Sequence, residues 1–101
     1  MTQLYWAPQA GEDLAAVFAY ITQDSEQYAW LTVREIVAAT GRLREFPELG
    51  RVVPELNRPD VRELIWRSYR IVYQYRSAQD EAWILTVFRG ERQFEVPESI
   101  R

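Results

Sequence analysis

Residues 61–92 read VRELIWRSYRIVYQYRSAQDEAWILTVFRGER, and this stretch decides the fold. Its apolar side chains recur at about every second position, which is the period of a β-strand. Arg67-Ser68 and the segment from Ser77 to Glu81 interrupt that pattern with residues suited to turns. We therefore predict three antiparallel strands joined by two hairpin turns.

The two turns determine which side chains face each other. The first predicts Trp66 opposite Tyr69, Leu64 opposite Ile71 and Arg62 opposite Tyr73. The second predicts Tyr75 beside Trp83, Tyr73 beside Leu85 and Ile71 beside Val87. One face of the sheet is then almost wholly apolar and must pack against another layer. A slip of one residue would exchange the two faces.

The opposite face of this sheet is a mixture, too apolar for bulk water and too polar for a core. It carries Glu63, Ile65, Arg70, Val72, Gln74, Ile84, Thr86 and Phe88. An arginine cannot shed its charge, so Arg70 needs water, an acid or an anionic partner. Two interpretations stay open: a binding surface, or a solvated face on which an acid such as Glu63 neutralises Arg70.

The chain before this stretch reads as a strand followed by two helices. Gln3–Trp6 predicts a short strand, and Pro8 suits the first turn of a helix. The first helix should end near Gln23, and its buried face follows the i, i+3, i+4, i+7 rule. That face consists of Leu14, Val17, Phe18 and Ile21. Asp13 reads as a charge near the start of this helix.

The second helix should begin at a Ser25 cap and stop at Phe46-Pro47. Its buried stripe consists of Ala29, Val33, Ile36, Thr40 and Leu43. We expect Trp30 to be exposed beside this stripe and to mark an interface on the helical hairpin. The segment from Pro47 to Asp60 holds three of the five prolines and Gly50, so it predicts an ordered surface loop without regular structure.

The predicted fold class is therefore α+β, with element order β-α-α-β-β-β. An N-terminal strand and an antiparallel helical hairpin should pack with a small, mainly antiparallel sheet, the hairpin covering one of its faces. At 101 residues, the chain should form one domain, residues 1–101, with a single modest core.

Composition narrows the possible functions. The chain has no cysteine and no histidine, which removes disulfides, thiol nucleophiles, imidazole catalysis and the usual zinc sites. We expect no metal and no cofactor, because no phosphate-binding glycine loop or metal-ligand spacing occurs. The net charge of -3 argues against nonspecific nucleic-acid binding. No apolar run approaches the ~18 residues of a membrane helix, and the first residues lack a signal-peptide pattern, so we expect a cytoplasmic protein.

Several short motifs occur together in a characteristic order. They are Trp6-Ala7-Pro8, Asp13-Leu14, Tyr20-Ile21, Phe46-Pro47-Glu48-Leu49-Gly50-Arg51, Val61-Arg62-Glu63-Leu64 and Tyr69-Arg70-Ile71-Val72-Tyr73. In this order and spacing the chain closely resembles the RelE/ParE toxin superfamily of bacterial type II toxin–antitoxin systems, over nearly its entire length.

This resemblance implies a small bacterial growth inhibitor that a cognate antitoxin keeps silent. Such an antitoxin, ParD-like or related, would wrap the toxin with an amphipathic or extended C-terminal segment. The superfamily contains two activities: RelE-like members cut messenger RNA on the ribosome, and ParE-like members poison DNA gyrase. Modules of this kind also serve in plasmid stabilisation.

The resemblance favours the gyrase-directed branch, in which the toxin binds a protein and need not be an enzyme. Arg70 matches the sheet arginine of the ribonucleases, but Gly90 falls where a second catalytic arginine is expected and Val96 lies near the position of a C-terminal tyrosine. Two alternatives stay open. A metal-independent endoribonuclease would use Arg70, Arg89, Glu63 and Glu91. A non-toxic relative would only bind the antitoxin.

We expect the partner-binding residues to combine arginines with exposed apolar side chains. They are Trp30, Arg62, Ile65, Arg70, Val72, Ile84, Phe88, Arg89 and Arg92. Aliphatic residues of the antitoxin would fill the apolar part of this surface, and its acids would meet Arg70 and Arg92. For Arg62 and Arg89, purely structural roles stay open. No sequence-specific nucleic-acid binding is expected.

Overall fold

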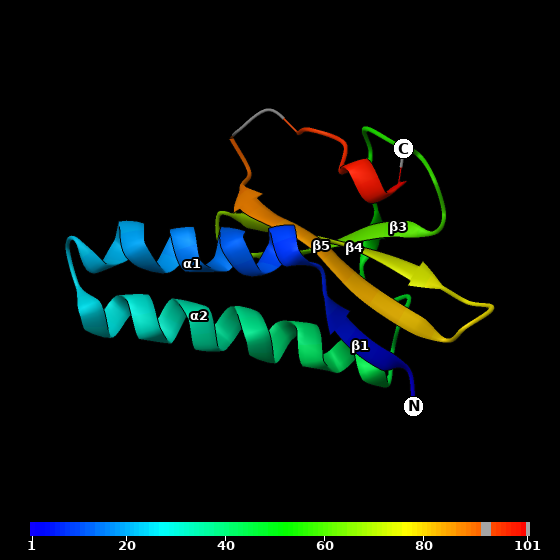
Figure 1. The fold of residues 1–101 in the computed structure, drawn as a ribbon, viewed down its shortest axis with the longest axis horizontal. Coiled ribbons are helices and arrows are strands. Elements are labelled where there is room, and N and C mark those ends of the chain that lie inside the picture. Colours follow the sequence, from blue (N-terminus) through cyan, green and yellow to red (C-terminus); the bar gives the residue numbers. More distant parts are fainter. Residues whose placement is uncertain (92–93, 101) are drawn as a thin grey trace.

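Two helices pack against a five-stranded β-sheet in the computed structural model, which describes residues 1–91 and 94–100 (Figure 1). The elements are β1 (Gln3–Trp6), α1 (Pro8–Thr22), α2 (Glu26–Gly41), the short helix η1 (Arg42–Arg44), β2 (Arg51–Val52), β3 (Val61–Trp66), β4 (Tyr69–Arg76), β5 (Glu81–Arg89) and the short helix η2 (Glu98–Ile100). The predicted α+β class and element order are confirmed.

The sheet order is β1-β5-β4-β3-β2. β1 runs parallel to β5, and the other neighbours are antiparallel. β2 corrects the prediction of a loop without regular structure, because Arg51 pairs with Glu63 and Val52 pairs with Arg62. Two residues of strand are too short to leave a recognisable period in the sequence.

The helical hairpin forms largely as its sequence predicts. α1 begins at Pro8 and ends at Thr22, one residue before the predicted end. The Ser25 hydroxyl accepts a hydrogen bond from the Tyr28 amide at 3.1 Å and caps α2. The α-helix ends at Gly41 and the chain continues as η1, so the regular helix is shorter than the predicted run to Phe46-Pro47.

The first hairpin has the predicted register, with all three expected pairs in place. In the second hairpin, Ile71 faces Val87 as predicted, but a β-bulge follows Val72. Tyr73 therefore faces Ile84 and not Leu85, and the predicted Tyr73–Leu85 pair is wrong. Tyr75 likewise faces Ala82 and not Trp83. Leu85 is the extra residue of the bulge, and an inserted residue reverses the faces of everything beyond it.

Two apolar clusters result, one on each face of the sheet. The cluster under the helices contains Ala10, Ile36, Leu43, Tyr69, Ile71, Tyr73, Ala82, Ile84 and Val87. The second lies on the other face, which we call the open face, and contains Val53, Val61, Val72, Leu85 and Ile100. Residues of the 53–60 loop and of the tail 94–100 pack onto this face, so much of it is covered.

Candidate functional site

A chain of alternating charges lies on the open face. The Glu63 side chain, from β3, has no exposed surface. Its carboxylate accepts a hydrogen bond from Arg70 Nε at 2.6 Å and another from Arg51 Nε, also at 2.6 Å. Arg70 comes from the neighbouring strand β4 and Arg51 from β2. A buried carboxylate is costly unless it is paired, so this acid is held by two arginines at once.

Arg70 has a second carboxylate partner on the 53–60 loop. Its two terminal nitrogens donate to the two oxygens of Glu55, each at 2.8 Å, which is the bidentate geometry of a guanidinium and a carboxylate. The guanidinium carbon lies 5.2 Å from the ring centre of Phe88 and 5.6 Å from that of Phe94. The Arg70 side chain is only 11% exposed. The predicted anion anchor is therefore already occupied.

The pKa values of this pair shift in the direction that its hydrogen bonds require. The Arg70 hydrogen bonds lower the pKa of Glu55 from 4.5 to about 2, against the opposing effect of burial. The hydrogen bonds to Glu55, and then the one to Glu63, raise the pKa of Arg70 above its usual range, against the opposing effect of burial. Both groups therefore stay charged at every physiological pH.

Arg62 donates hydrogen bonds to backbone carbonyls of the segment that precedes β3. Its Nε donates to the carbonyl of Pro59 at 3.1 Å, and its Nη1 donates to the carbonyl of Gly50 at 2.9 Å. The nearby Tyr73 hydroxyl donates to the Pro47 carbonyl at 2.8 Å and accepts from the Gly50 amide at 2.9 Å. The structural interpretation of Arg62 fits these contacts, because the guanidinium satisfies backbone carbonyls of the turn.

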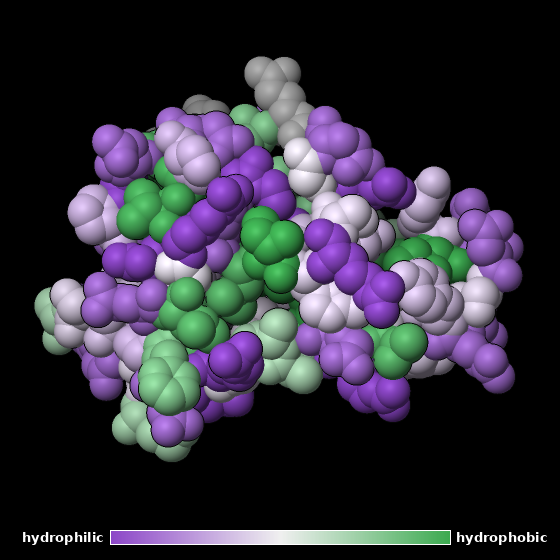
Figure 2. All heavy atoms as spheres, turned by 180° about the vertical axis from the view of Figure 1, so that it is seen from behind, coloured by the Kyte–Doolittle hydropathy of each residue, from purple (hydrophilic) through white to green (hydrophobic). Residues whose placement is uncertain are grey.

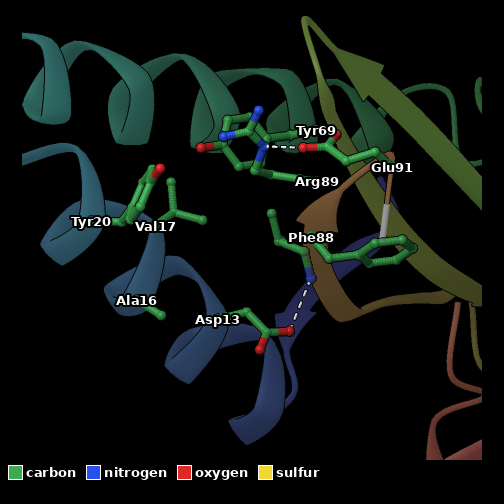
Figure 3. A pocket seen from close by; sticks show the side chains of 9 residues that line it. Asp13, Ala16, Val17, Tyr20, Tyr69, Phe88, Arg89 and Glu91 are labelled. Carbon is green, nitrogen blue, oxygen red and sulfur yellow. Dashed lines mark hydrogen bonds and ion pairs between the residues drawn. The ribbon is translucent and has the colours of Figure 1, made fainter. Parts of the chain in front are cut away.

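A groove of about 500 Å³ runs between α1 and the end of β5 (Figure 3). Its lining is Asp13, Ala16, Val17, Tyr20, Tyr69, Val87, Phe88, Arg89 and Glu91. Arg89 and Glu91 form an ion pair at 2.6 Å, with side chains that are 44% and 60% exposed. Figure 3 shows that the Arg89 side chain lies beside Tyr69, while Phe88 points away from it. The groove thus combines an apolar floor with a charged end.

The four residues of the ribonuclease alternative are divided between the two faces of the sheet. Arg70 faces Phe88 across the ladder, whereas Arg89 faces Tyr69. Successive residues of a strand point to opposite faces, so Arg89 lies on the helix side and Arg70 on the open face. Glu63 stays with Arg70, and Glu91 pairs with Arg89. The described geometry does not bring these four side chains to one phosphate.

The predicted apolar partner residues have different environments. Ile65 is 53% exposed and Trp30 is 59% exposed, as expected for Trp30. Trp30 also packs edge-on against Phe18, with ring centres 4.6 Å apart. Val72 lies on the open face but is fully covered by the second cluster. The prediction that Ile84 lies on that face is wrong, because the bulge turns it into the core beneath the helices.

Arg92 lies outside the described residues. The sequence interpretation missed three residues that the structure brings into these networks, Arg51, Glu55 and Asp13. Arg51 and Glu55 lie where no helical or strand period marks a side chain as inward. The Asp13 carboxylate accepts from the amide of Val87 at 3.0 Å and from the hydroxyl of Thr86 at 2.5 Å.

The predicted role of Asp13 as a charge at the helix N-terminus is wrong, because α1 begins at Pro8 and its first turn contains no acid. β1 pairs with only Glu81–Ile84 of β5, and the carboxylate satisfies an amide on the outer edge beyond that point. An acid that covers a strand edge protects it from unwanted pairing. The early position of Asp13 in α1 is the one sequence signal that could have indicated this contact.

The surface seen from behind carries several hydrophobic patches among hydrophilic residues, including one in the middle of the face (Figure 2). The large exposed apolar side chains are Met1, Tyr5, Tyr20, Tyr28, Trp30, Val37, Phe46, Leu49 and Ile65. Exposed aromatic residues on the helical hairpin are typical of protein-contact surfaces. Among residues 1–91 and 94–100, no cluster of acids that could hold a metal occurs, and no helix is long and apolar enough to cross a membrane.

Comparison with known proteins identifies related sequences and structures. Residues 4–94 match the model of the family described as "ParE toxin of type II toxin-antitoxin system, parDE". A chain of the chromosomal ParDE toxin–antitoxin system of P. aeruginosa is 26% identical, with 90% of this chain and 98% of that chain aligned at a TM-score of 0.73. No curated protein sequence matches the chain.

Two RelE structures share the fold at lower identity. A mutant of the E. coli toxin RelE in the free state is 16% identical, with 89% of this chain and 84% of that chain aligned at a TM-score of 0.65. A chain of the intact E. coli RelBE toxin–antitoxin complex is 18% identical, with 91% of this chain and 100% of that chain aligned at a TM-score of 0.59.

Proposed function

Because this chain belongs to the ParE toxin family of type II toxin–antitoxin systems, we propose that it stops bacterial growth by poisoning DNA gyrase in the cytoplasm. The family match over residues 4–94 carries this proposal. As a toxin of such a system, the protein has an antitoxin as its partner. The choice of gyrase as the target rests on the resemblance of the sequence to ParE-like toxins.

The separation of Arg70 from Arg89 supports a binding toxin over a ribonuclease. Cutting RNA without a metal needs an acid, a base and cations around one phosphate. Gly90 lies beside Arg70, since a Cβ added at Gly90 would be 3.8 Å from the Arg70 side chain. A cationic residue at that position could reach the same anion, but glycine supplies no charge.

The carboxylates around Arg70 are also poor general bases. Glu63 is fully buried between two guanidiniums, and the pKa of Glu55 is about 2. A general base works best with a pKa near the operating pH. Arg70 itself stays protonated and cannot take a proton. The Arg70 guanidinium suits the binding of an anion better than proton transfer.

For the antitoxin, we propose the groove between α1 and β5 as the docking site. Its apolar floor includes Val17, Tyr69 and Val87, and its rim carries the Arg89–Glu91 ion pair. Such a groove fits aliphatic side chains of an amphipathic segment, with polar contacts at the rim.

The target is tested by inducing the protein alone in growing bacteria and following the incorporation of labelled thymidine and labelled methionine. We expect DNA synthesis to fall first, and purified gyrase to convert supercoiled plasmid into linear DNA when the protein is present. An earlier fall in protein synthesis would refute the gyrase proposal in favour of the ribonuclease. Unchanged growth would indicate a relative that only binds its antitoxin.

The docking site is tested with two neighbouring alanines on α1, both exposed. Ala16 lines the groove and Ala15 does not. The product of the adjoining reading frame serves as the antitoxin. We expect it to restore growth to cells that express the wild type or Ala15→Arg, and not to cells that express Ala16→Arg. Rescue of both variants would exclude the groove.

A further inference from the structure

Arg70 binds two carboxylates that differ in how firmly they are held. Glu63 has no exposed side-chain surface and is shared with Arg51. The Glu55 side chain is 44% exposed, and among the described side chains it is Arg70 that donates to both of its carboxylate oxygens. Glu55 belongs to the 53–60 loop, which lies outside the regular strands. Glu63 is therefore a fixed part of the network, and Glu55 is its outer member.

Releasing the Glu55–Arg70 pair would affect its two members unequally. The Glu55 carboxylate already meets solvent and could be hydrated fully. The Arg70 side chain is only 11% exposed and its guanidinium lies against the rings of Phe88 and Phe94, where water cannot readily replace a lost anion. Without Glu55, the remaining charges of Arg51, Glu63 and Arg70 sum to +1. A vacated Arg70 therefore favours the binding of another anion.

We propose that Arg70 forms an exchangeable carboxylate slot, in which Glu55 stands in for an acidic side chain of the antitoxin. This inference rests on the proposed function, because it takes the antitoxin as the partner. The slot offers two parallel N–H donors, and Glu55 shows that a carboxylate fills them with good geometry. Binding exchanges one carboxylate for another and leaves the buried Glu63 contact intact.

A protein carboxylate fits this slot better than a nucleic-acid backbone does. The chain has a net charge of -3, so a polyanion is repelled at long range. The acids Glu55 and Glu63 flank Arg70 directly. A single acidic side chain on an otherwise apolar segment meets much less repulsion.

The slot itself is tested by chemical rescue. Glu55→Ala empties it, and Glu48→Ala is a matched control, because Glu48 is 68% exposed and contacts Arg62 at 3.4 Å. We expect sodium acetate, compared with equal sodium chloride, to raise the Tm of Glu55→Ala by about 2–3 °C at the acetate concentration equal to its Kd. The wild type and Glu48→Ala should not respond. An equal effect of acetate and chloride on the Tm would refute the proposal of a carboxylate slot. A larger rise in Tm with phosphate would refute the proposal that its ligand is a carboxylate.

The occupant is tested with the antitoxin that rescues growth. We expect Glu55→Ala to bind it about fivefold more tightly than the wild type, since no stand-in must be displaced, and Glu48→Ala to bind it like the wild type. Equal affinity of the two variants would overturn the inference while leaving the proposed function intact. If the product of the adjoining reading frame neither rescues growth nor binds the wild type, the antitoxin docking in the proposed function fails, and the inference fails with it.

Discussion

Replacing Glu63 by glutamine should destabilise the protein strongly, although the side chain keeps its size. The carboxylate accepts one hydrogen bond from Arg51 and one from Arg70, both at 2.6 Å. An amide has one acceptor oxygen and one NH₂ group. One guanidinium would keep its contact, and the other would face an N–H group inside a site without solvent.

The magnitude follows from the burial of the partners. Losing a hydrogen bond to a charged group costs about 1.5–3 kcal/mol, and breaking a buried ion pair costs about 3–5 kcal/mol. Arg51 is 60% exposed and can turn to water, and Arg70 keeps Glu55. We therefore expect a loss of about 2–3 kcal/mol for Glu63→Gln, which corresponds to a Tm lower by roughly 10–20 °C.

Urea unfolding followed by tryptophan fluorescence measures this loss, since the chain has four tryptophans. Two variants with the same change of charge calibrate the result. Glu55→Gln affects a partly exposed carboxylate and should lose about 1 kcal/mol, and the mostly exposed Glu48→Gln should lose less than about 0.5 kcal/mol. Equal losses in all three, or a loss below about 0.5 kcal/mol for Glu63→Gln, would refute the argument from burial.

Three further predictions test other contacts. Gly50→Ala should cost about 1–3 kcal/mol in urea unfolding, because its Cβ would lie 2.6 Å from the Glu63 carbonyl oxygen; wild-type stability would exclude this close approach. The pKa of Glu55 is lowered from 4.5 to about 2, so its stabilisation is fully present above pH 4.5 and is lost as the pH falls to about 2. The stability difference between the wild type and Glu55→Gln should shrink over that range, and its disappearance between pH 7 and 5 would contradict the shift. Asp13→Ala should speed hydrogen exchange of the Val87 amide severalfold, whereas unchanged exchange would show that another group protects this amide.

Local rules predicted the elements and the first hairpin well. The two-residue turn at Arg67-Ser68 allows few alternative strand pairings. The alternation of apolar and polar residues is therefore enough to predict the register of β3 and β4. The second hairpin failed at one point, because a bulge depends on the packing of both faces and leaves no period of its own. Leu85 and Ile84 are equally apolar, and only the folded core decides which of them faces the helices.

The site was predictable in part for a related reason. Arg70 could be selected because a charged residue inside an apolar strand needs a partner, and Glu63 could be suggested from the adjacent strand. Glu55 could not be suggested, because its position depends on the path of a loop that contains Pro54 and Pro59. Long charged side chains and irregular loops allow many possible ion pairs. The alternation of apolar and polar residues along the strands does not show which of these pairs forms.

The position of the bulge also bears on the choice between a nuclease and a binding toxin. Along β5 the bulge comes before Thr86, so residues 86–89 keep the predicted register with β4. Each of these four side chains therefore points to the face that the sequence predicts. Bringing Arg89 to the face of Arg70 would require a further one-residue slip. That slip would turn Val87 out of the helix-side core, where it is almost fully buried, and put Phe88 in its place. Losing a buried valine contact and overpacking a phenylalanine each cost about 1–3 kcal/mol, so the packing that stabilises the helical layer also holds the two arginines apart.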